Sequence, residues 1–164
     1  KAEAERWQMR EAMQRQAILL EELSTPLIPI SEQIVVMPLV GTVDSSRAQQ
    51  MCETLLHGVT RLRAKVAIID VTGMRTVDQA AISGIMAAVR AVRLLGADVV
   101  LTGIRPEIAV ALIRSGADLT GVATTGSLQA GIQGVVQRLD QPARVRAGAG
   151  AALSALAAPF PPPR

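Results

Sequence analysis

The chain is nearly devoid of aromatic residues: its 164 residues include one tryptophan, one phenylalanine and no tyrosine. Trp7 and Phe160 lie near the two ends, so any globular core must be built from aliphatic residues and methionine. Proteins that bind single-stranded nucleic acid stack bases on aromatic side chains, and duplex binders carry a basic stripe. Residues 31–140 hold ten Lys or Arg against nine Asp or Glu, so no such stripe is visible. The sequence therefore predicts no nucleic-acid partner.

Cysteine and histidine occur once each, which limits the chemistry available to the chain. A lone cysteine, Cys52, excludes a disulfide within the chain and is typical of a reducing compartment, so we expect a cytoplasmic protein. Cys52 falls on an apolar stripe at helical spacing and is expected in the core, whereas His57 falls on the polar side of the same stretch. No cluster has metal-ligand spacing, and no glycine-rich phosphate loop is present. The sequence predicts no catalytic residue, no metal and no cofactor.

Long apolar runs and a secretory signal are also missing. A membrane-spanning helix needs about 18 or more consecutive apolar residues, and the chain has no such run, so no membrane partner is expected. The first residue is Lys1 rather than methionine. We therefore expect a fragment or processed product, with a further domain upstream.

Residues 1–23 are rich in Glu, Arg, Gln, Met and Ala, without Gly or Pro, and are expected to form a linker helix. Its apolar residues follow alternating steps of four and three, the spacing of a coiled-coil seam. The seam consists of Met9, Met13, Leu20 and Leu23, with Gln16 in register. A narrow seam opposite a charged face favours a dimerising helix. The alternative is an amphipathic helix that lies on its own domain.

Residues 24–140 alternate apolar strands with amphipathic helices, the pattern of an α/β fold with crossover connections. The expected strands are 27–30, 34–40, 66–69, 98–102 and 122–124, and the expected helices are 45–62, 79–95, 106–115 and 127–139. Pro29 and Pro38 limit their strands to edge or bulged positions. The sequence thus predicts a mixed, largely parallel sheet packed with about four helices. Residues 141–164 are rich in Ala, Gly and Pro and are expected to form a disordered tail.

The stretch from Lys65 to Gly96 is the most plausible seat of function. Asp70 follows a buried strand, which we expect it to end, and Asp78 is a natural N-cap for the next helix. Both border a loop at the carboxyl end of a parallel strand, where α/β proteins commonly bind ligands. Two carboxylates there could act as an acid–base pair. Strand termination and helix capping explain both residues without catalysis.

Four segments carry a resemblance to a known family: ELSTPLIPI at 22–30, VVMPLVGTVDSSRAQQMCETLL at 35–56, DVTGMRTVD at 70–78 and AVRLLGADVVLTGIRPEIA at 91–109. In these the chain resembles the STAS domain of anti-sigma factor antagonists, and most of all the co-antagonist scaffold of the bacterial stressosome. The resemblance implies a STAS fold behind a linker helix, a homodimer, and a larger assembly with STAS paralogues. It also implies sequestration of a serine/threonine kinase until stress triggers phosphorylation and release.

The family's regulatory hydroxyl follows an Asp at the helix start, a position that Gln79 occupies here. The second acceptor of the co-antagonists aligns near Val110 or Ala111, which also lack hydroxyls. The chain is therefore either a scaffold that is not phosphorylated, or one whose switch has moved to Thr76, Ser83 or Thr72. Of these, Ser83 is expected to be partly buried. The resemblance implies a partner-binding surface made of Thr72, Gly73, Thr76, Asp78, Gln79 and Ser83.

Two other classes of function stay open at this stage. A STAS module could bind a small ligand or nucleotide through the same loops, including Gly103 to Glu107 at the end of the next strand. An enzyme comes third, and only an activity abolished by Asp78→Asn would bring it forward.

Overall fold

A computed structural model describes residues 1–75 and 77–141, and for residues 17–24 it describes the backbone alone. The chain divides into two compact units, Lys1–Gly131 and Ile132–Arg164. The elements are α1 (Ala2–Ser24), β1 (Ile28–Pro29), β2 (Ile34–Gly41), α2 (Ser45–Leu62), β3 (Val66–Met74), α3 (Gln79–Leu94), β4 (Asp98–Thr102), α4 (Pro106–Arg114), β5 (Ala123–Thr125) and α5 (Leu128–Asp140). The predicted tail lies outside the described residues from 142 onward, and so does Thr76.

The five strands form one sheet in the order β1-β2-β3-β4-β5. β1 pairs antiparallel with β2, as a short hairpin requires, and every other neighbouring pair is parallel. Parallel neighbours need long crossovers, which α2, α3 and α4 supply. The predicted α/β fold, a mixed and largely parallel sheet with a preceding N-terminal helix, is confirmed.

The two strand prolines occupy the positions that their missing N–H groups allow. Pro29 lies in the edge strand β1, opposite Val35. Pro38 lies in β2, where the register with β3 shifts between Pro38 and Val40. The prediction of edge or bulged positions is confirmed.

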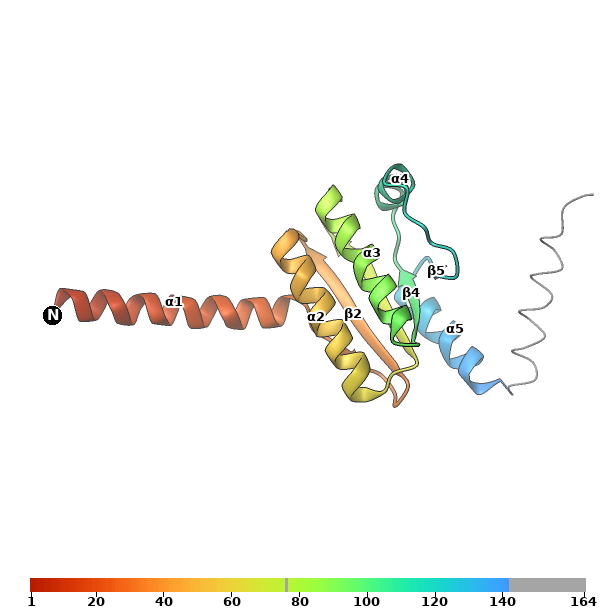
Figure 1. The fold of residues 1–164 in the computed structure, drawn as a ribbon, viewed down its shortest axis with the longest axis horizontal. Coiled ribbons are helices and arrows are strands. Elements are labelled where there is room, and N and C mark those ends of the chain that lie inside the picture. The colour runs from red at the N-terminus through yellow and green to blue at the C-terminus, as the bar shows by residue number, and fades with distance from the viewer. Residues whose placement is uncertain (76, 142–164) are drawn as a thin grey trace, which may run out of the picture. The chain divides into compact units, whose positions relative to one another are not determined.

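Helices α2 and α3 lie side by side over one face of the sheet, and the main core fills the space between (Figure 1). Alternate residues of β2 point into it: Val35, Met37 and Leu39 are each at most 1% exposed. Burying an aliphatic side chain of this size contributes about 1.5–3 kcal/mol. The two helices approach closely because Gly84 of α3 faces Ala48 of α2; a Cβ added at Gly84 would lie 2.4 Å from the Cβ of Ala48.

Helix α2 follows its sequence pattern. It buries Met51, Leu55 and Val59 against the sheet, while His57 is exposed as expected. Cys52 lies half-buried beside this core rather than within it, and burial, followed by the charge of Glu53, raises the pKa of its thiol. The thiol is therefore held in its neutral form at physiological pH.

Strand β3 is longer than predicted, and the expectation that Asp70 ends it is wrong. The strand continues to Met74 because β2 extends alongside it, with Val40 opposite Gly73 and Gly41 opposite Met74. The buried side chain of Met74 anchors this extension in the core. Asp70 therefore lies inside a strand, with consequences for the site below.

Candidate functional site

The first turn of α3 is built as the sequence predicts. Oδ1 of Asp78 accepts a hydrogen bond of 2.9 Å from the backbone N–H of Ala81, which satisfies a donor that the helix leaves unpaired. Gln79 is therefore the first helical residue, and its side chain is exposed. Its Nε2 donates to Oγ of Ser83 over 3.3 Å. Ser83 is exposed, so its predicted partial burial is wrong: Ile82 occupies the face that turns inward.

Asp70 joins two strands at the carboxyl edge of the sheet. Its Oδ1 accepts a 2.8 Å hydrogen bond from Oγ1 of Thr72 and another of 2.8 Å from Oγ1 of Thr102. Thr102 is fully buried and lies directly opposite Asp70 in the β3–β4 register. The carboxylate therefore links β3 to β4, and the hydroxyl of Thr72 is already engaged by it.

Gly103 lies against the hydroxyl cluster, which consists of Asp70, Thr72 and Thr102. Its φ of +73° is a conformation that favours glycine, and an added Cβ would lie 1.8 Å from Oγ1 of Thr72 and 2.9 Å from Oδ1 of Asp70. A side chain at Gly103 would thus displace Thr72 or the carboxylate. The hydroxyl cluster depends on the absence of a Cβ at this residue.

Arg105 attaches the start of α4 to the end of β3. Its guanidinium donates to the backbone carbonyl of Met74, and Arg105 is also the N-cap residue of α4, directly before Pro106. The backbone N–H of Arg75 donates to the carbonyl of Gly41 over 2.9 Å. The segment that leads into Asp78 is therefore held at its beginning by two contacts. One is to the end of β2, and the other is to the loop that follows β4.

These contacts define what we call the β3–α3 surface: Thr72, Gly73, Asp78, Gln79 and Ser83, all exposed or half-buried. Thr76, which the sequence also placed there, lies outside the described residues. Asp70 and Asp78 each have their own hydrogen-bond donors, which fits structural roles for both. Among the described residues, no three His, Cys, Asp or Glu side chains gather as a metal site would need.

Two features of this edge escaped the sequence analysis. Thr102 was not singled out, although it ends the apolar run of β4 as Asp70 ends that of β3, and Arg105 was named only as part of the loop from Gly103 to Glu107. The cap of α2 was also missed: Ser45 is the first residue of this helix, as expected, but it follows an Asp44 whose Oδ1 accepts from the N–H of Arg47 over 2.8 Å. The repeated Val–Asp pairs at 43–44 and 77–78 could have revealed that both helices begin in the same way.

No helix within the described ranges combines the length and the apolar character that a membrane span requires.

The two residues that align with the second acceptor, Val110 and Ala111, lie on α4. Val110 is exposed, and Ala111 packs partly buried against the core.

Comparison with known proteins places this geometry in context. The model of the STAS domain family matches residues 25–125. RsbT co-antagonist protein RsbRA of Bacillus subtilis is 47% identical over 135 residues, which cover 82% of this chain and 48% of that protein. RsbS of Moorella thermoacetica is similar in structure, with a TM-score of 0.64 and 32% identity over 71% of this chain and 98% of that chain. A chain of the stressosome, described as a signal integration and transduction hub, gives a TM-score of 0.60 and 29% identity over 71% of this chain and 100% of that chain. The chain spans less than half the length of the curated RsbR relatives that it matches.

Proposed function

The chain belongs to the STAS domain family, and from this premise we propose that it is a non-enzymatic signalling scaffold of a stressosome-type complex. In this role it binds partner STAS proteins and sequesters a serine/threonine kinase in the cytoplasm. The observation that carries the proposal is the 47% identity to RsbRA, which is named for opposing another protein rather than for transforming a substrate.

The β3–α3 surface is suited to docking a protein. Asp78 caps α3, and the Gln79–Ser83 hydrogen bond orders two exposed polar side chains on its first turns. The link from Arg105 to the carbonyl of Met74 fixes the end of β3 beside it. Such a rigid, polar platform offers hydrogen bonds to a partner with little ordering cost on binding.

Regulation by phosphorylation would differ from the family pattern because Gln79 has no hydroxyl. We propose that the chain acts as a scaffold that is not modified at residue 79. If the switch has moved, Ser83 is better placed than Thr72: both are exposed, but the Thr72 hydroxyl donates to Asp70, whereas that of Ser83 accepts from Gln79. Thr76 remains a candidate outside the described residues.

Co-assembly with a STAS paralogue and a stressosome-type kinase tests the scaffold role. We expect the three proteins to elute together in size-exclusion chromatography. Gln79→Arg should weaken the complex, because it adds a bulky charge to the β3–α3 surface. Gln129→Arg is the matched control, since Gln129 is also an exposed glutamine in the first turn of a helix, α5. Separate elution of the unmodified chain would contradict the proposal.

We further propose that α1 forms a homodimer through its seam. Met9 is 61% and Met13 63% exposed, so both are free to meet a second helix. The side chains of Leu20 and Leu23 lie outside the described residues. Sedimentation equilibrium should show a dimer that Met13→Lys weakens and Gln14→Lys, on the opposite face of α1, does not. Equal effects of the two variants would exclude the seam.

The nucleotide-binding alternative finds less support at the carboxyl edge. Gly103 packs against Thr72 and Asp70, and the Arg105 guanidinium is engaged by Met74. The groups that would hold a phosphate there already have partners in the fold. Calorimetry with nucleoside triphosphates should show no saturable heat, and saturable binding would revive this alternative.

A further inference from the structure

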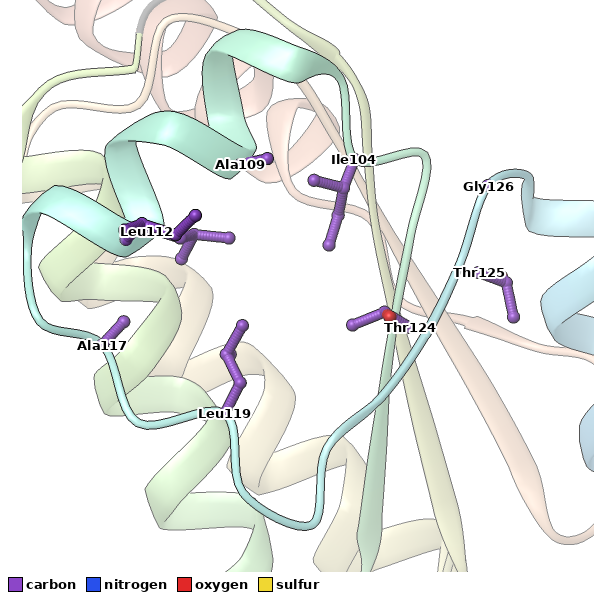
Figure 2. Close-up of a pocket in the computed structure, with 9 residues that line it drawn as sticks. Ile104, Ala109, Leu112, Ala117, Leu119, Thr124, Thr125 and Gly126 are labelled. Carbon is purple, nitrogen blue, oxygen red and sulfur yellow. The ribbon is translucent and has the colours of Figure 1, made fainter.

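A pocket of about 430 Å³ opens between α4, the segment that follows it and the end of β5 (Figure 2). It is separate from the β3–α3 surface and involves none of its residues. Its lining consists of Ile104, Ala109, Leu112, Ile113, Ala117, Leu119, Thr124, Thr125 and Gly126.

The lining is mostly apolar. The side chains of Ile104, Leu112 and Leu119 come from three different segments and point toward one another across the opening (Figure 2). None of the nine lining residues is charged. The hydroxyl of Thr124 is the exposed polar group at its wall, whereas the hydroxyl of Thr125 donates to the carbonyl of Ser127.

Hydrogen bonds within the protein hold the outer wall in place. Arg93 of α3 donates from Nη1 to the carbonyl of Thr120 over 2.8 Å, which fixes the segment after α4. Within that segment the N–H of Thr120 donates to Oδ1 of Asp118, and the N–H of Val122 to the carbonyl of Leu119. Leu119 is therefore positioned by hydrogen bonds on both sides. A preformed wall lowers the ordering cost of binding.

We propose that this pocket binds a small, uncharged and mostly apolar molecule with one hydrogen-bonding group. The volume lies in the range of about 300–1,000 Å³ that is typical of small-molecule sites. An ionised ligand would lose water there without gaining a charged partner, so nucleotides and free carboxylates are disfavoured. Thr124 supplies the polar contact that would orient the ligand. This inference does not depend on the scaffold role proposed above.

The uncharged fluorophore N-phenyl-1-naphthylamine is a direct probe, with 1-octanol as a competitor. The full chain should bind the fluorophore saturably, with one site per chain, and 1-octanol should displace it. Ala109→Phe fills the pocket and should raise the dissociation constant roughly tenfold or more. Val110→Phe adds the same ring one residue along α4, outside the lining, and should leave binding unchanged.

Methyl NMR keeps the test valid if Ala109→Phe fails to fold. In the unmodified chain, the fluorophore should shift the methyl signals of Ile104, Leu112 and Leu119 and leave those of Val35 and Leu55 in place. Ala117→Leu offers a second, smaller filling variant with the same expected loss. The proposal is overturned if no saturable binding occurs, or if binding survives both filling variants.

A pocket that instead receives a partner's side chain would give a different result. The STAS paralogue would then displace the fluorophore, and Ala109→Phe would disrupt co-assembly with the paralogue; this outcome also overturns the proposal. Failure of co-assembly by the unmodified chain, with fluorophore binding intact, would overturn only the scaffold role.

Discussion

The buried hydroxyl of Thr102 donates to Oδ1 of Asp70 over 2.8 Å and joins β4 to β3 at the carboxyl edge of the sheet. The exposed hydroxyl of Thr72 donates to the same oxygen. One carboxylate thus organises two strands directly beneath the β3–α3 surface.

Thr102→Val should destabilise the fold by about 1.5–3 kcal/mol, the usual contribution of a hydrogen bond to a charged group. Valine keeps the methyl group of Thr102 and removes only the donor. Thr72→Val is the control and should cost less, because its hydrogen bond is exposed. Urea denaturation measures both. Equal losses would show that burial of the hydroxyl is unimportant.

Gly84→Ala should destabilise by about 1–3 kcal/mol, although alanine is the better helix former, because the new methyl group would overlap Ala48. Ala48→Gly makes room for it. In a double-mutant cycle the two changes should therefore cost less together than the sum of their separate effects. Ala87→Gly, on the exposed side of α3, is the matched control and should combine additively with Gly84→Ala.

The free energy of unfolding should fall as the pH rises above 9.0, the ordinary pKa of the Cys52 thiol. Burial raises this pKa in the folded state, so the unfolded chain loses its thiol proton at a lower pH than the folded chain. Deprotonation then favours the unfolded state as the pH increases. The contribution of the protonated Cys52 thiol to the free energy of unfolding is fully present below pH 9.0. Comparing Cys52→Ala with the unmodified chain isolates the effect: their stability difference should change only at alkaline pH. A difference independent of pH would disprove the assignment.

Gln79→Thr should create a phosphoacceptor for a stressosome-type kinase. The new hydroxyl would follow Asp78 at the start of α3, where the helix dipole favours the added charge of about −1.5 to −2. Mass spectrometry after kinase treatment should locate one phosphoryl group at residue 79. Gln129→Thr, in the first turn of α5, should gain none. Phosphorylation of a known paralogue but not of Gln79→Thr would count against a conserved kinase contact.

Local signals in the sequence predicted much of this fold. Asp78 marks the start of α3, and Gly96 and Gly116 follow α3 and α4 with φ of +86° and +68°. These features depend on residues close together in the chain. The same holds for the exposed position of Gln79.

Apart from the burial of Ser83, what the sequence did not predict concerns contacts between distant segments. The continuation of β3 to Met74 depends on pairing with β2, and the burial of Thr102 depends on its register with Asp70. The pocket beside α4 requires Ile104 and Leu119 to meet through the fold. No periodicity within one segment reports such pairings.

The strand order has a consequence for how the chain folds. Because β1 to β5 lie in the sheet in the order in which they are synthesised, each strand adds to the edge left by the one before. No strand must be inserted between two that are already paired. As the chain emerges from a ribosome, the sheet can therefore grow from its amino-terminal side. Until β5 arrives, the apolar strand β4 presents an open edge, at which the nascent domain is exposed to aggregation.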